Sequence, residues 1–269
     1  MAAKRMDLNK RTFLVLSGSS NPLGQTLALQ LCSRLAPGSV ALILDDDQEK
    51  LASLEQLLRE LLKPDIVQLR TGKLDEHHSN GVELMEQALK QAELSTVFER
   101  SIIVHNEGVA ATEVLMEPQL SQDWAAYVQQ QLYAPVALNQ RWLHCKQLTD
   151  VEKLAINVTS SLLVRPLIHS GLLCSCKRAR DMYFRAMASE EARRNVHVLS
   201  YAPGLLDSHQ TQYDVNGNMI NPESLVTSSQ MLQMPRAQPL QATLKLINIL
   251  EKISFVSGHD VDYYDTFVL

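Results

Sequence analysis

A chain of 269 residues, 45% of them hydrophobic and 20% charged, has the composition of a globular protein and is long enough for one α/β domain with a substantial core. Its apolar runs fall short of the roughly 18 residues that a membrane-spanning helix needs, so we expect no membrane segment. A net charge of −5 without a block of lysine or arginine predicts no nucleic-acid partner.

The first part of the chain contains two predicted strand–helix units. Met1–Arg11 is polar and basic and has no apolar stretch typical of a secretory signal, so we expect a frayed terminus. Thr12–Leu16 is a predicted strand, followed by a glycine-containing turn and a helix over Gln25–Leu35. Val40–Leu44 is a second strand, and Glu49–Leu62 is a leucine-rich helix.

The same alternation continues toward the C-terminus. Further strands are predicted at Ile66–Leu69, Ser101–Val104, Leu154–Val158, Val196–Tyr201 and near Val261. Further helices are predicted at Val82–Ala92, Trp124–Leu148, from after Leu173 to about Arg193, and at Leu240–Leu250, with an irregular loop at Asp214–Pro222. Apolar strands that alternate with helices predict one domain over residues 1–269, a Rossmann-type doubly wound parallel α/β sheet with helices on both faces.

The cysteines are scattered along the chain, at positions Cys32, Cys145, Cys174 and Cys176. The pair Cys174-x-Cys176 has no second Cys/His pair at metal-ligand spacing, so we predict no metal site. We expect reduced thiols in a cytoplasmic protein. A structural or redox role for the pair is the alternative.

The stretch Asn157–Lys177 has a hydroxyl cluster at a strand end and a lysine early in the next helix. In order and spacing it resembles the motif of the short-chain dehydrogenase/reductase family, with Ser160, Leu173 and Lys177 at the serine, tyrosine and lysine positions. Agreement is greatest with one branch of that family, the sepiapterin reductases. The segments that carry this agreement are Pro37–Val40, Ala179–Met182, Tyr201–Gly204 with Leu206-Asp207, and the tail from Leu250 to Asp265.

The resemblance implies a nicotinamide cofactor at the carboxyl edge of the sheet and a pterin-like small-molecule substrate. It also implies a dimer built from the helices after the fourth and fifth strands. The dimer is either a homodimer or a heterodimer with an active relative, and the sequence does not separate the two.

The residues of the implied catalytic site differ from the family pattern. In the family, the tyrosine exchanges the proton, the lysine lowers its pKa, the serine orients the substrate oxygen, and an asparagine, here Gln131, completes a relay. Leu173 has no proton to transfer, so we expect a retained pocket with lost or reduced chemistry. The alternative is an active reductase that uses water or a substitute acid, for which the candidates are His169, Ser170 and Cys174. Ser160 and Lys177 also have plain structural readings, as a strand-end hydroxyl and a solvated lysine.

The glycine-rich turn is the first part of the implied cofactor site. The resemblance assigns cofactor contacts to Gly18, Ser20, Leu23 and Gly24, whose backbone would approach a pyrophosphate at a helix N-terminus. Pro22 lacks an N–H, which predicts weaker phosphate contact, although proline is well tolerated as the first residue of a helix. A plain turn that binds nothing is the alternative.

The second strand ends in Asp45-Asp46-Asp47, where Asp46 aligns with an arginine of the sepiapterin reductases. Carboxylates would repel a 2′-phosphate, and Asp45 could accept hydrogen bonds from an adenosine ribose. If a dinucleotide binds, we therefore predict NAD(H) over NADP(H). The alternative is that Asp46 or Asp47 is only the N-cap of the following helix.

Later loops complete the implied cofactor and substrate sites. The resemblance assigns Asn106, Gly108, Lys177, Pro203 and Gly204 to the cofactor. Glu107 replaces the family's small residue, which predicts a steric and electrostatic penalty. The resemblance assigns Asp262 to the amino-pyrimidine edge of a pterin, whose two adjacent donors suit a carboxylate. Asp260, Asp265 or a plain surface turn are the alternatives.

Overall fold

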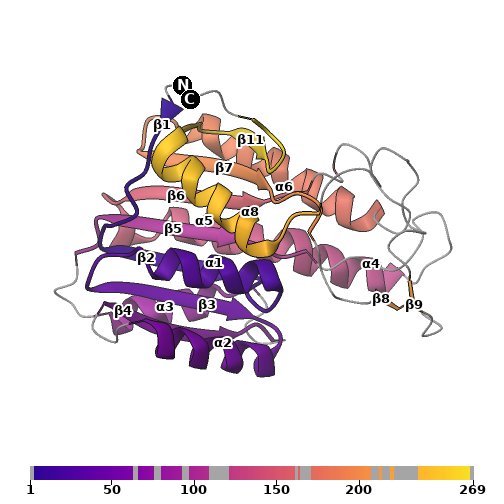
Figure 1. Ribbon diagram of the computed structural model, residues 1–269, viewed down its shortest axis with the longest axis horizontal. Helices are drawn as coiled ribbons and strands as arrows, with labels where there is room; N and C mark the ends of the chain where they lie inside the picture. Colours follow the sequence, from indigo (N-terminus) through magenta and orange to yellow (C-terminus); the bar gives the residue numbers. More distant parts are fainter. Residues whose placement is uncertain are drawn as a thin grey trace.

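The computed structural model describes residues 3–62, 66–75, 80–92, 97–108, 121–160, 163, 171–206, 212–213, 219–220 and 236–266. Within these ranges, a seven-stranded sheet has the order β11-β7-β6-β5-β2-β3-β4, with every neighbouring pair parallel (Figure 1). Its strands are β2 Thr12–Ser17, β3 Ser39–Asp45, β4 Val67–Lys73, β5 Arg100–His105, β6 Glu152–Val158, β7 Val196–Ala202 and β11 His259–Asp262.

Helices cover both faces of the sheet. One face packs against α1 Pro22–Cys32, α2 Gln48–Leu61 and α8 Pro239–Asn248. The other packs against α3 Val82–Gln91, α5 Ala134–Leu143 and α6 Gly171–Glu190. The predicted doubly wound parallel fold is confirmed.

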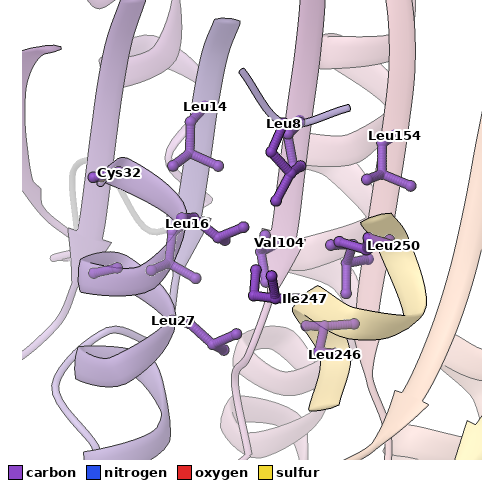
Figure 2. Packing of buried hydrophobic residues seen from close by; sticks show 14 of the residues in the cluster. Leu8, Leu14, Leu16, Leu27, Cys32, Val104, Leu154, Leu246, Ile247 and Leu250 are labelled. Atoms are coloured by element: carbon purple, nitrogen blue, oxygen red, sulfur yellow. The ribbon is translucent and has the colours of Figure 1, made fainter. Parts of the chain in front are cut away.

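The core lies in two layers because successive side chains of a strand point to opposite faces. Leu14 and Leu16 of β2 pack with Leu27 of α1 and Leu246 of α8 in one layer (Figure 2). Phe13 and its neighbours pack in the other layer. Burial of this much apolar surface fixes the register of the strands, and with it the position of every loop at their ends.

The expectation of a frayed N-terminus is wrong. Strand β1, Ala3–Lys4, pairs with β10, Phe255–Val256, in an antiparallel ladder. Met6 and Leu8 are fully buried, and the amide of Met6 donates to the Leu250 carbonyl at 2.7 Å. The apolar side chains inside this basic segment therefore anchor it to the core.

The single helix expected at Trp124–Leu148 is interrupted. The chain forms α4 Ser121–Val128, a π-helix at Gln129–Tyr133, α5, and a 3₁₀ turn at Lys146–Leu148. Pro135 lacks the N–H that would bond to the carbonyl of Gln131 in an α-helix, and such a missing bond favours an irregular turn. Such π-helical turns often occur at functional sites, and this one contains Gln131.

Other predicted boundaries shift by a few residues. Helix α1 begins at Pro22 rather than Gln25, and β4 extends to Lys73. The expected irregular loop contains β9, Met219–Ile220, which pairs with β8, Gln212–Tyr213. Helix α8 continues into a π-helix at Ile249–Ile253. Within the described ranges, no helix is long and apolar enough to cross a membrane.

Candidate active site

The predicted site residues lie at the carboxyl ends of neighbouring parallel strands. Gly18 follows β2, Asn106 follows β5, Ser160 follows β6, Pro203 follows β7 and Asp262 ends β11. Strands β2 and β5 are adjacent although their numbers are not, so the strand order reverses between them. Ligands of open α/β sheets bind at such a switch point.

The glycine turn requires its glycines because backbone segments meet there. Gly18 has a φ of 71°, and a Cβ on it would lie 2.6 Å from the carbonyl carbon of Asn106. A Cβ on Gly24 would lie 2.3 Å from the Gly18 carbonyl oxygen. The Nδ2 of Asn106 donates to that same oxygen at 2.7 Å. Asn106 thereby fastens the end of β5 to the turn.

The start of α1 confirms the expected role of Pro22 in the first turn of the helix. Asn21 is the N-cap, and its Oδ1 accepts from the Gly24 amide at 2.8 Å. The Ser20 amide donates to Asp45 Oδ2 at 2.6 Å. Two backbone amides of the turn, those of Ser20 and Gly24, therefore already donate hydrogen bonds within the protein.

The three aspartates after β3 have different surroundings. Asp45 is 3% exposed, and its second oxygen accepts from the Asp47 amide at 3.1 Å. Asp45 thus links the end of β3 to the glycine turn by a hydrogen bond. Asp47 is the N-cap of α2, as the alternative reading predicted, and accepts from the Lys50 amide. Asp46 is exposed and accepts a hydrogen bond from Gln130 at 2.9 Å.

Lys177 is buried, so its reading as a solvated lysine is wrong. It is 7% exposed, and its Nζ donates to the Val158 carbonyl at 2.8 Å and lies 3.5 Å from that of Thr159. Burial and the nearby charge of Arg180 lower its pKa to about 7. A Cβ on Gly108 would lie 2.6 Å from Lys177 Cε and 3.7 Å from Leu173 Cδ1. The lysine and the leucine therefore meet at Gly108, as the motif spacing predicts.

Arg180 is a site residue that the sequence reasoning did not single out. It is fully buried, and its Nε donates to Asn157 Oδ1 at 3.2 Å. Its Nη1 contacts Glu107 Oε2 at 3.2 Å and the Gln131 carbonyl at 3.3 Å, and its Nη2 contacts the Val158 carbonyl at 3.3 Å. The guanidinium therefore joins the ends of β5 and β6 to the π-helix. Pro135 indicated that the Gln131 carbonyl lacks its α-helical donor, but no sequence signal connected that carbonyl to Arg180.

The charge of Glu107 is compensated within the protein by Arg180, and the penalty to a cofactor expected from the sequence stays a prediction. Its side chain is 12% exposed, and Oε1 lies 3.8 Å from Nδ1 of the fully buried His105. Burial opposes ionisation, but His105 and Arg180 hold the pKa of Glu107 at about 2. Glu107 is therefore an ionised carboxylate and is excluded as a proton donor near neutral pH. Among the described residues, neither ring nitrogen of His105 has a hydrogen-bond partner.

Gln131 contributes its backbone rather than its side chain to this cluster. It is 2% exposed and lies in the π-helix. Within the described parts of the chain, its Oε1 has no hydrogen-bond partner. The predicted relay position therefore lies next to Arg180, with an amide oxygen left over for a ligand or water.

The remaining predicted residues lie farther along the same edge. Ser160 is partly exposed, and its carbonyl accepts from the Leu163 amide at 3.0 Å. Gly204 has a φ of 80°, and a Cβ on it would lie 3.0 Å from Tyr263. Asp262 Oδ1 accepts from the Tyr264 amide at 3.0 Å, which is the geometry of a tight turn.

The alternatives to these residues have partners of their own or lie outside the described residues. Asp260 is engaged with Arg185, and Asp265 accepts from the Asp262 amide at 2.9 Å. None of the four cysteines forms a disulfide, and among the described residues no group of three metal-ligating side chains occurs. His169, Ser170 and Asp207 lie outside the described residues.

The comparison with family models agrees with this geometry, since the model for short chain dehydrogenases matches residues 13–218. The chain belongs to this family.

Solved structures of other oxidoreductases share the fold. An NAD⁺-bound xylitol dehydrogenase superposes with a TM-score of 0.71 at 15% identity, covering 95% of this chain and 98% of the other. An NADPH-bound short chain oxidoreductase from Pseudomonas aeruginosa PAO1, described as containing an atypical catalytic center, has a TM-score of 0.70 at 19% identity, with 96% of both chains covered.

The similar short chain dehydrogenases include sepiapterin reductases. That of Xenopus laevis is 29% identical over 98% of this chain and 100% of its own length. That of Mus musculus is 30% identical over 93% of this chain and 96% of its own length. Both matches span nearly the whole chain. The protein is therefore a sepiapterin-reductase-like short chain dehydrogenase.

Proposed function

We propose that this short chain dehydrogenase retains a pterin and/or dinucleotide pocket and has lost or impaired hydride-transfer chemistry. The observation that carries the proposal is Leu173 beside Lys177 at Gly108, in the position that the motif assigns to the proton-donating tyrosine. Reduction of a carbonyl leaves an alkoxide that needs a proton, and general acid catalysis is worth about 10²–10⁴ in rate. An aliphatic side chain such as that of Leu173 supplies none of this rate enhancement.

The cofactor part of the proposal rests on the glycine turn. Gly18 and Gly24 allow the close backbone packing of this turn at the N-terminus of α1, where a pyrophosphate would bind, whereas Pro22 and the engaged Ser20 amide would weaken the contact. The exposed carboxylate of Asp46 would repel a 2′-phosphate, which favours NAD(H) over NADP(H). A nicotinamide cofactor would supply the hydride; Lys177 would hold its ribose, and Pro203 and Gly204 would flank it.

The substrate part of the proposal rests on Ser160 and Asp262. Both lie at the carboxyl edge, Ser160 after β6 and Asp262 at the end of β11, and β7 is the strand between β6 and β11. Asp262 would accept the two donors of a pterin amino-pyrimidine edge, and Ser160 would orient the side-chain oxygen. The relatives are named for sepiapterin, a pterin, which supports this class of ligand.

The test is reduction of sepiapterin with NADH and with NADPH. We expect slow turnover by the wild type and a large gain in Leu173→Tyr. Turnover by the wild type at the rate of an ordinary reductase would exclude the proposal.

An active carbonyl reductase of tetrahydrobiopterin biosynthesis is the second candidate. The retained Ser160 and the buried Lys177 favour it, and water or His169 would donate the proton. The same assay separates it from the first candidate.

A dimer partner of an active relative is the third candidate. Tyr133, in the π-helix, is 59% exposed and Met182, on α6, is 62% exposed, which suits a helical interface in a homodimer or a heterodimer. Light scattering of wild type and Met182→Glu would test this contact. Unchanged mass in the variant would count against it. A cytoplasmic location remains part of the proposal and rests on the four cysteines, none of which forms a disulfide.

A further inference from the structure

The end of the tail, from Asp262 to Asp265, is a hydrogen-bonded turn, which we call the tail turn. The Asp265 amide donates to the Asp262 carbonyl at 3.0 Å, and the Asp262 amide donates to Asp265 Oδ2 at 2.9 Å. Inside the turn, Asp262 Oδ1 accepts from the Tyr264 amide at 3.0 Å. Lys245 on α8 fastens the turn, since its Nζ donates to the carbonyls of Tyr263 and Asp265. Asp262 and Tyr264 therefore belong to one hydrogen-bonded unit.

The tail turn contacts the loop after β7, which contains Gly204, a residue assigned to the cofactor. The Tyr263 amide donates to the Ala202 carbonyl at 2.8 Å. The Tyr263 ring lies so close to Gly204 that a Cβ there would be 3.0 Å from Cδ1 of the ring. The Leu205 amide donates to the Tyr264 hydroxyl at 3.0 Å. The end of β7 and its loop are therefore held at three points by two tyrosines of the tail turn.

Tyr264 links the two halves of the candidate site through its two ends. Its backbone amide bonds to the carboxylate of Asp262, and its hydroxyl accepts from Leu205, the residue after Gly204. Its ring packs edge-on against that of Tyr263, with 5.3 Å between the centroids and 85° between the planes. A ligand that immobilises Asp262 therefore also orders Tyr264 and lowers the entropy cost of ordering the loop.

We propose that Tyr264 is a positioning residue that couples the pterin site at Asp262 to the cofactor loop at Gly204, so that pterin binding tightens dinucleotide binding. This proposal rests on the proposed pterin and dinucleotide pocket and names how its two halves communicate. Tyr264 acts through the Asp262 carboxylate and the Leu205 amide. By linkage, the dinucleotide tightens pterin binding by the same factor.

The test measures the Kd of NADH for the full chain by calorimetric titration, without and with saturating unsubstituted pterin, which carries no side-chain ketone to reduce. The ratio of the two Kd values is the coupling factor. We expect a factor of about five in the wild type, a size typical of coupled sites. Tyr264→Phe removes the hydroxyl but keeps the ring and the amide that bonds to Asp262. It should lower the coupling factor about threefold, which the loss of one hydrogen bond can produce.

Tyr263→Phe is the matched control, because it removes the neighbouring hydroxyl and keeps the ring beside Gly204. Its coupling factor should equal that of the wild type. Hydrogen exchange of the Leu205 amide in the ligand-free protein should be faster in Tyr264→Phe alone, because only this variant removes the acceptor.

Two kinds of failure are distinguishable in this experiment. A coupling factor near 1 in the wild type, or an unchanged factor in Tyr264→Phe, would overturn the role of Tyr264 and leave the proposed pocket in place. Failure of NADH or of pterin to bind to the wild type would instead overturn that half of the proposed pocket, and the coupling with it.

Discussion

Lys177 and Arg180 stand one helical turn apart on α6 and converge on the same oxygen, the carbonyl of Val158, at 2.8 and 3.3 Å. The motif lysine is thus part of a buried charge cluster rather than an isolated side chain. Glu107 is the compensating carboxylate of that cluster. The electrostatics of the candidate site follow from these three groups.

Removing the charge of Glu107 should destabilise the protein. Glu107→Gln leaves the fully buried Arg180 without a counter-charge, and breaking a buried pair in this way costs roughly 3–5 kcal/mol. Urea denaturation of wild type and variant measures the difference. The matched control is Glu86→Gln, whose pair with Arg141 is largely exposed and should cost less than about 1 kcal/mol. Equal losses in both variants would contradict the account.

Acid should weaken the fold through the same carboxylate. The pKa of Glu107 is about 2 in the folded protein, against an ordinary value of 4.5, so its contribution is fully present above about pH 4.5 and is lost as the pH falls toward 2. Unfolding midpoints between pH 6 and 3 measure this loss. The pH dependence should be smaller in Glu107→Gln. If the variant showed the same pH dependence of unfolding as the wild type, groups other than Glu107 would cause the acid sensitivity.

Lys177 should produce a second rise of stability with pH, in a higher pH range. Its pKa is about 7 when folded and near 10.5 when unfolded, so the unfolded chain binds more protons between these values. Stability should therefore rise from pH 7 to 9, by up to about 1.4 kcal/mol per pH unit. Lys177→Met should lack this rise. Parallel stability curves for the two proteins would show that Lys177 titrates normally.

Asp46 should select the dinucleotide. We expect NADH to bind more tightly than NADPH, and Asp46→Arg to reverse the order by pairing with the 2′-phosphate. Fluorescence titration with both nucleotides measures the ratio. Asp47→Ala is the control, because it removes the α2 cap and should change stability without changing the ratio. Tighter binding of NADPH by the wild type would contradict the assignment.

The parallel fold was predictable from sequence because apolar strands such as Val40–Leu44 leave few alternatives to a sheet covered on both faces. The N-terminal anchor was missed because Met6 and Leu8 are isolated apolar residues in a basic segment. Only their contact with the far end of the chain, at Leu250, shows their role.

The candidate site was predictable where residues stand at fixed spacing, as Ser160, Leu173 and Lys177 do. Arg180 was not, since its importance depends on partners from β5, β6 and the π-helix, which no local pattern joins. Asp45 shows the same limit. Its position at the strand tip was predicted, but its inward bond to the Ser20 amide arises from the three-dimensional path of the turn.

The central claim is that Leu173 leaves the site without an effective proton donor, and one measurement tests it most directly. The rate of sepiapterin reduction with NADH should rise about 10²-fold or more from wild type to Leu173→Tyr, whereas Leu173→Phe, which adds the ring without the hydroxyl, should remain at the wild-type rate. A fast wild type, or equal rates in the Tyr and Phe variants, would contradict the account.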